Sequence, residues 1–140
     1  MAEYIPLKIK KLILAASHGY CEYCWSPSEY TSAIYHFDHI LPVVNGGKSV
    51  FLNMAYSCNA CNSYKSDRIH YLDSMTQQIC SLYHPRNDLW TDHFQWSDDA
   101  LRIEGITPTG RATIALLRVN RPQVMNLRLI LKLTGLHPPF

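Results

Sequence analysis

The sequence has no long apolar run, no internal repeat and no low-complexity segment. Of its 140 residues, 47% are apolar and 17% are charged, which is the composition of a globular protein. These absences exclude a membrane span, a collagen-like chain and a largely disordered one. A chain of this length forms one domain of ordinary size, or one compact motif with an appendage.

Acidic residues are missing from the last quarter of the chain, where no Asp or Glu follows Glu104. The basic residues of that quarter are Arg111, Arg118, Arg121, Arg128 and Lys132. Because the net charge is only +2, overall composition does not indicate a nucleic-acid-binding protein. The local excess favours an anionic partner such as a phosphate backbone, with a solvated helix face as the alternative.

The N-terminus lacks an apolar run long enough for a secretory signal. Three lysines precede Leu12-Ile13-Leu14-Ala15-Ala16, which is shorter than the usual apolar region of about 7–15 residues. Five cysteines form two CxxC pairs and a lone Cys80, a pattern that favours metal binding in a reducing compartment over disulfides. We therefore expect a cytoplasmic protein without membrane contact, in which Cys80 is a small buried residue.

The segment from residue 21 to residue 65 carries the most informative pattern. Cys21-Glu22-Tyr23-Cys24 opens it and Cys58-Asn59-Ala60-Cys61 closes it. Two CxxC pairs separated by a few tens of residues have the spacing of a tetrahedral four-cysteine site, because each pair directs two thiolates at one centre. The sequence thus predicts a structural Zn²⁺ bound by Cys21, Cys24, Cys58 and Cys61.

Periodicity predicts an α+β fold. We expect a helix within residues 1–18, a strand over 33–40, a Gly-Gly loop and a second extended segment over 51–57. After Cys61 the pattern predicts one longer helix, with Leu72, Met75, Ile79 and Leu82 on one face. His84-Pro85 marks a break, so we divide the chain into residues 1–83 and a docked extension, 84–140.

In the extension, residues 94–106 predict a hairpin and residues 107–117 predict a helix. A last helix is expected to follow Asn120 as its cap, with Pro122 in its first turn. Trp90, Phe94 and Trp96 are expected in the core, with base stacking as the less favoured alternative.

Residues 21–65 resemble the motif of HNH endonucleases of the ββα-metal type. The resemblance comprises a CxxC pair, Asp38-His39-Ile40 with a nearby proline, a Gly-Gly loop, Asn53, and a second CxxC followed by Asn62 and a lysine. It covers about a third of the chain. It implies a small ββα-metal core held by the zinc knuckle. Together with the helix predicted before it, this core makes residues 1–83 the expected HNH nuclease domain, and the predicted hairpin and basic helices follow it.

The resemblance also implies residue roles. His39 matches the general base that deprotonates the attacking water, and Asp38 matches a ligand of the catalytic divalent metal. Asn53 matches the asparagine that orients the base through the loop backbone. Asn62 matches the last motif position as a metal ligand, which makes this an HNN variant.

Phosphodiester chemistry agrees with these roles. A histidine is the side chain suited to deprotonate water near neutral pH. Carboxylate and amide oxygens suit Mg²⁺ or Mn²⁺, whereas thiolates suit Zn²⁺. Neighbouring strand residues point to opposite faces, so Asp38 and His39 can share a site only where the strand bends.

We expect a DNA endonuclease with one Mg²⁺ or Mn²⁺, which cuts one strand at a time and therefore needs a homodimer or two encounters for a double-strand break. The expected phosphate-binding residues are Lys65, Arg68, Arg111, Arg118, Arg121 and Arg128. For Arg68 the alternative is a position on a solvated helix face. For His36 two roles stay open: contact with substrate, or a purely structural place in the strand. The alternative functions are a non-catalytic zinc module that binds nucleic acid or protein, and a nuclease acting on RNA.

Overall fold

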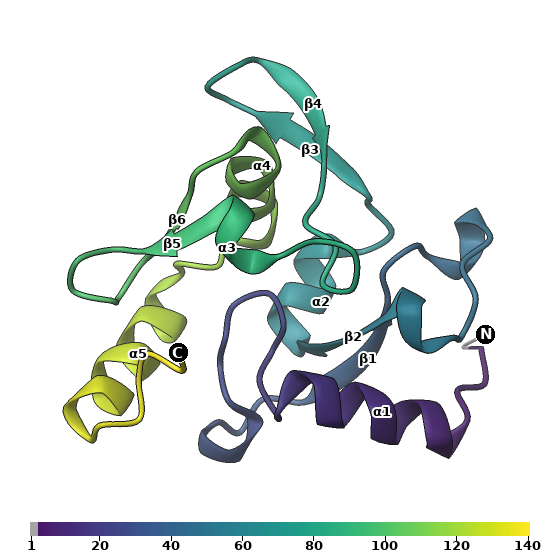
Figure 1. The fold of residues 1–140 in the computed structure, drawn as a ribbon, viewed down its shortest axis with the longest axis horizontal. Coiled ribbons are helices and arrows are strands. Elements are labelled where there is room, and N and C mark those ends of the chain that lie inside the picture. Colours follow the sequence, from purple (N-terminus) through teal and green to yellow (C-terminus); the bar gives the residue numbers. More distant parts are fainter. Residues whose placement is uncertain (1–2) are drawn as a thin grey trace.

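The computed structural model describes residues 3–140, which contain five α-helices and three two-stranded antiparallel sheets (Figure 1). The helices are α1 (Leu7–Ser17), α2 (Asn59–Lys65), α3 (Trp90–His93), α4 (Pro108–Leu117) and α5 (Pro122–Leu133). The strands pair as β1 (Tyr35–His39) with β2 (Met54–Cys58), β3 (His70–Asp73) with β4 (Gln78–Ser81), and β5 (Phe94–Trp96) with β6 (Ile103–Gly105). The predicted α+β class is confirmed. No helix in residues 3–140 has both the length and the apolar character that a membrane crossing requires.

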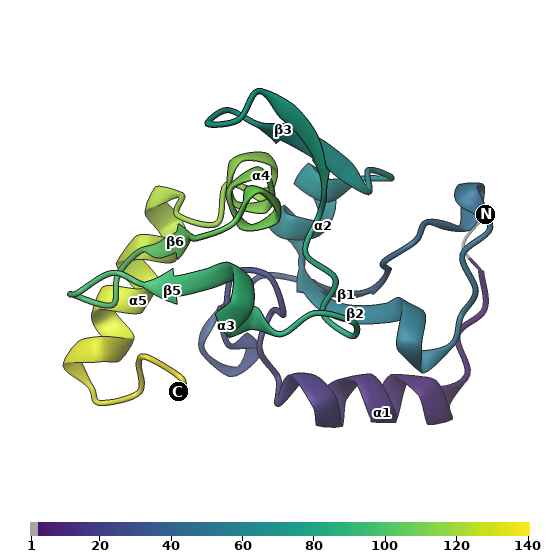
Figure 2. The ribbon, with the colours of Figure 1, turned by 45° about the horizontal axis from the view of Figure 1, so that its top comes forward.

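The sheet of β1 and β2 lies between two helices, with α1 on one side and α2 on the other (Figures 1 and 2). Its register pairs Asp38 with Ala55 and His39 with Met54. Helix α1 ends at Ser17, the next residue, His18, adopts a left-handed conformation, and the helix buries Ile13 completely. The β-branched and aromatic residues of β1 form the strand that the sequence predicts.

One hydrophobic core joins the segments before and after residue 84. The four clustered cysteines pack in it with Tyr23, Ile40 and Ala55 from the first segment and with Phe94, Leu117, Val119 and Val124 from the second. Arg86 adds a polar link, because its guanidinium donates to Glu22 Oε1 at 2.6 Å and to Oε2 at 2.9 Å. The extension therefore docks on the cysteine knuckle; a boundary at residue 84 remains our proposal.

The prediction of one long helix after Cys61 is wrong. Helix α2 ends at Lys65, where Ser66 has a φ of +51°, and residues 70–81 form the β3–β4 hairpin. Asp73 holds the turn, since its carboxylate accepts hydrogen bonds from the backbone N–H groups of Met75 and Thr76. Met75 is 74% exposed and Ile79 is 68% exposed, so these two residues of the predicted helix face meet solvent, whereas Leu82 lies in the core.

The predicted hairpin and helices of the extension are confirmed, with one correction. Asn120 does not cap α5, because Arg121 is the residue that precedes Pro122 at the helix start. The Asn120 amide instead holds β6: Oδ1 accepts from Ile103 N–H at 2.8 Å, and Nδ2 donates to Ile103 O at 2.9 Å. Trp90 and Phe94 are core residues, as expected.

Candidate zinc centre and nuclease site

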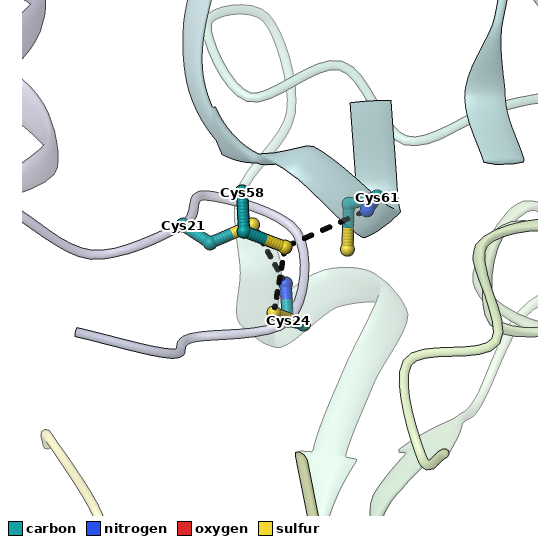
Figure 3. A group of neighbouring side chains, drawn as sticks. All are labelled: Cys21, Cys24, Cys58 and Cys61. Atoms are coloured by element: carbon teal, nitrogen blue, oxygen red, sulfur yellow. Dashed lines mark hydrogen bonds between the residues drawn. The ribbon is translucent and has the colours of Figure 1, made fainter. Parts of the chain in front are cut away.

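The four predicted zinc ligands meet at one buried point. Cys21 and Cys24 lie in the loop after α1, Cys58 ends β2, and Cys61 is in α2 (Figure 3). Their Sγ atoms all lie within 4.8 Å of one another, and the Cys24 and Cys58 sulfurs are 3.8 Å apart. A tetrahedron with Zn–S bonds of about 2.3 Å has edges of about 3.8 Å, so the donor set and its spacing fit Zn²⁺.

Backbone and side-chain donors surround these sulfurs. Each CxxC turn directs the N–H of its second cysteine at the first, at 3.5 Å in both Cys24→Cys21 and Cys61→Cys58. Ser26 Oγ lies 3.2 Å from Cys24 Sγ. Four thiolates around Zn²⁺ carry a net charge of −2, so such donors stabilise the filled site.

Arg121, which was predicted to bind phosphate, contacts the cysteine cluster instead. Its guanidinium lies 3.3 Å from Cys58 Sγ, 3.6 Å from Cys61 Sγ and 3.9 Å from Cys24 Sγ. Burial lowers the pKa of Arg121, but the neighbouring thiolates outweigh burial and raise it overall. This arginine compensates part of the negative charge of the cysteine cluster and ties the start of α5 to it.

We expect Arg121→Met to weaken zinc binding by about 10- to 100-fold, the range typical for loss of a partner of metal ligands. The measurement is competition with a colorimetric chelator on purified, zinc-loaded protein. Arg118→Met is the matched control, since exposed Arg118 contacts the Tyr64 ring but none of the sulfurs. Equal zinc affinity of the two variants would contradict this role of Arg121.

Arg128 was predicted to bind phosphate, and the structure corrects this. Only 2% of the residue is exposed, and its guanidinium donates to the carbonyls of Cys24, Leu101 and Val119 at 2.8–3.0 Å. Burial lowers its pKa to about 10, which still leaves it charged at neutral pH. Because its Nη1 and Nη2 atoms donate to carbonyls inside the core, Arg128 has no surface on which to meet a nucleic acid.

A second cavity lies at the end of β1, away from the sulfurs. It has a volume of about 410 Å³, and its lining includes His36, Asp38, His39, Asn62 and Asp67. The resemblance had implied that Asp38, His39 and Asn62 form one site, and strand β1 and helix α2 bring them to this cavity. Asp67 is an acidic lining residue that the sequence reasoning missed, because nothing in its spacing marks it.

Asp38 is held at the floor of this cavity. The residue is 8% exposed, and its Oδ2 atom lies 3.3 Å from Tyr23 Oη and 3.2 Å from Lys65 Nζ. Burial raises the pKa of the carboxyl, while the Lys65 ammonium opposes that shift. Within residues 3–140 both contacts reach Oδ2, which leaves Oδ1 free to act as a ligand.

Lys65 was also predicted to bind phosphate, and its position corrects this. It is 2% exposed, and besides Asp38 it contacts the backbone oxygen of His39 at 3.3 Å. A buried ammonium between a carboxylate and a carbonyl is paired inside the protein. Lys65 therefore positions the Asp38-His39 pair.

His39 and Asn53 are fixed by the Gly-Gly loop. His39 Nε2 lies 2.8 Å from Ser49 Oγ. Asn53 Oδ1 accepts from Leu41 N–H at 2.8 Å, and its Nδ2 donates to the carbonyls of Leu41 and Lys48 at 3.0 Å. Gly47 is required here, since a Cβ atom would lie 1.7 Å from Leu41 O. Asn53 thus clamps the loop that carries Ser49.

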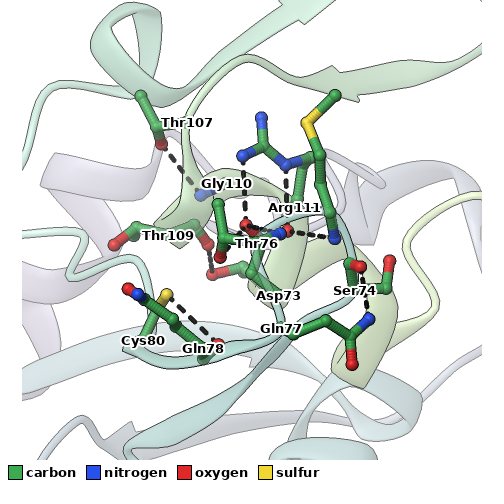
Figure 4. Close-up of polar contacts among 12 residues, drawn as sticks. Asp73, Ser74, Thr76, Gln77, Gln78, Cys80, Thr107, Thr109, Gly110 and Arg111 are labelled. Carbon is green, nitrogen blue, oxygen red and sulfur yellow. Dashed lines mark hydrogen bonds and ion pairs between the residues drawn. The ribbon is translucent and has the colours of Figure 1, made fainter.

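The remaining predicted phosphate ligands differ in accessibility. Arg111 pairs with Asp73, its Nε and Nη2 atoms donating to the carboxylate at 2.9 and 3.0 Å, and so ties α4 to the β3–β4 hairpin (Figure 4). Hydrogen bonds from Arg111 and the turn hold the pKa of Asp73 well below its usual range. Arg68 and Arg118 are exposed and remain candidates for phosphate binding.

Comparison with known protein families shows that the model of the HNH endonuclease family matches residues 21–68. The resemblance read from the sequence is confirmed for this segment, which contains the zinc cluster and the second cavity. The match supports a nuclease-type function, that of a hydrolase acting on nucleic acids. Searches of curated proteins and of solved structures give no significant match.

Proposed function

We propose that this protein is a metal-dependent endonuclease that hydrolyses phosphodiester bonds in DNA. The observation that carries the proposal is the cavity in which Asp38, His39 and Asn62 converge, within the segment that matches the HNH family. An imidazole beside two oxygen donors is the set that water activation on a phosphodiester requires. The buried cysteine cluster has no open ligand position, so it serves as scaffold.

His39 acts as the general base. Its Nε2 atom is engaged by Ser49 at 2.8 Å, so Nδ1 is the ring nitrogen left to take a proton from water. The clamp by Asn53 fixes the loop that carries Ser49 and thereby the orientation of the imidazole. Asn53 is a positioning residue in this proposal, as is Ser49.

Asp38 Oδ1 and the Asn62 side-chain oxygen would hold the divalent ion. Two oxygen donors in an open cavity suit Mg²⁺ or Mn²⁺, which keep several waters and complete their coordination with substrate phosphate. When bound, such an ion supplies charge neutralisation at the phosphate and at the leaving oxygen. Lys65 and Tyr23 hold Asp38 in place from the side of Oδ2.

One such site cuts one strand. A double-strand break would therefore require a homodimer or two successive encounters, and we propose nicking as the elementary reaction. We also keep the proposal of a cytoplasmic protein, because reduced thiols are needed for the zinc cluster.

Purified protein is expected to nick supercoiled plasmid when Mg²⁺ or Mn²⁺ is added, and to lose at least about 10²-fold in rate when it is omitted. Omission is preferable to a strong chelator, which would also attack the zinc cluster. Structured RNA is tested in parallel, and a higher cleavage rate on RNA than on DNA would identify RNA as the substrate. Binding of nucleic acid without cleavage under any metal condition would favour a non-catalytic zinc module.

A further inference from the structure

Two further hollows extend from the proposed cleavage cavity along the surface of α2. The first, of about 460 Å³, shares Ser66 and Asp67 with the cavity and is also lined by Arg68 and Tyr71. The second, of about 490 Å³, shares Tyr64, Ala115 and Arg118 with the first. Because neighbouring hollows share lining residues, the three lie side by side from β1, across α2, to the turn between α4 and α5, and we refer to this row as a groove.

The outer part of this groove is positively charged. Arg68, Arg102 and Arg118 line it and are exposed, and within residues 3–140 none of them forms a salt bridge. Among residues 3–140, the first outer hollow has one acidic lining residue, Asp67, and the second has none. Elsewhere in the described chain, Lys65, Arg86 and Arg111 pair with carboxylates. Within residues 3–140 the groove is thus lined by three arginines that have no carboxylate partner.

Two of these arginines are oriented by aromatic rings. The Arg68 guanidinium lies 5.6 Å from the centre of the Tyr71 ring, and that of Arg118 lies 4.8 Å from the centre of the Tyr64 ring. A stacked guanidinium keeps its N–H edge available for phosphate oxygens and loses less rotamer freedom when it binds them.

We propose that this groove, which we call the arginine groove, binds the phosphate backbone of the strand that is cut, on one side of the cleavage cavity. The proposal rests on the proposed function, since the cavity defines where the strand begins its path. Guanidinium groups on phosphates give contacts that do not depend on base sequence. Arg102, which the sequence reasoning did not single out, joins Arg68 and Arg118 as a phosphate ligand.

Binding without cleavage tests the groove separately from the nuclease activity. The His39→Ala protein, without added divalent metal, is titrated with fluorescent single-stranded and duplex DNA across a range of salt concentrations. Adding Arg68→Gln and Arg118→Gln is expected to lower the slope of log affinity against log salt by about 0.9 per arginine on duplex, or about 0.7 on single strands. Arg102→Gln should lower it by a similar further step.

The matched control removes two charges from the opposite side of the β1–β2 sheet, as Lys8→Gln with Lys11→Gln on exposed positions of α1. It should leave the slope unchanged, and Arg118→Lys, which keeps the charge, should do the same. An unchanged slope in the arginine variants, or an equal fall in the lysine control, would overturn the proposal. Neither result depends on catalysis, whereas a failure of the proposed function would appear as absent cleavage with the salt slopes intact.

Discussion

Replacing His39 by alanine is expected to lower the rate of plasmid nicking by about 10²- to 10⁴-fold, the usual contribution of a positioned general base. This loss corresponds to about 3–5 kcal/mol in the activation free energy. His39 is half-exposed at the end of β1, and its imidazole contacts Ser49 on the loop rather than the core. The variant should therefore fold normally, keep its zinc and bind DNA.

His70 provides the comparison for His39. It is exposed on β3 and does not line the cleavage cavity, so His70→Ala should cleave at nearly the rate of the unmodified protein. Initial nicking rates at saturating Mg²⁺, together with zinc content and circular dichroism, separate a chemical effect from a folding effect. If His39→Ala cleaves as fast as His70→Ala, the base is another residue.

Local patterns were sufficient for the elements around the zinc cluster. The two CxxC pairs fixed which thiols meet, because a CxxC turn brings two sulfurs together whatever surrounds it. The β-branched and aromatic run over 33–40 predicted β1, whose observed bounds are Tyr35–His39. The family motif then indicated that Asp38, His39 and Asn62 converge, and they do line one cavity.

The predictions that were wrong concern residues whose structure depends on contacts between distant segments. Leu72, Met75 and Ile79 have helical spacing, but the Asp73 carboxylate stabilises a turn that reverses the chain. Asp73 also pairs with Arg111, which lies 38 residues further along the sequence. A sequence also shows where charged residues occur along the chain, but not which carbonyls or carboxylates their side chains contact in the fold. Arg128 and Lys65 read as surface cations, yet each is 2% exposed because main-chain oxygens and Asp38 bind it inside the fold.

Removal of zinc is expected to unfold the protein. Structural zinc contributes about 10–16 kcal/mol of apparent binding free energy in small metal-dependent domains, against a total stability of about 5–15 kcal/mol for an ordinary domain. Here the metal would join the loop after α1, the end of β2 and the start of α2, the elements that position the cleavage cavity. The two ranges overlap, so the metal contributes about as much as the whole stability of an ordinary domain, and we expect the fold to be lost without it.

Cys61→Ser tests this with a close control in the same chain. Cys80 lies half-buried in β4, outside the cluster, with its Sγ 3.5 Å from Gln78 O. We expect Cys80→Ser to retain one zinc per chain and a cooperative thermal transition, and Cys61→Ser to lose both. A zinc-free Cys61→Ser protein that melts cooperatively near the temperature of the unmodified protein would show that the core suffices without metal.

The extension should also respond to the loss of zinc, although it contributes no zinc ligand. Arg121 is held by the sulfurs of Cys58 and Cys61, and Arg128 donates to the carbonyl of Cys24, so α5 rests on the cluster through two cations. Without the anionic cluster, Arg121 would be a poorly compensated charge close to the core, which is unfavourable. Hydrogen exchange in residues 122–133 is therefore expected to accelerate together with exchange in β1 and β2 as chelator is added. Protection of α5 that persists after β1 and β2 have opened would show instead that the extension is stable without the zinc knuckle.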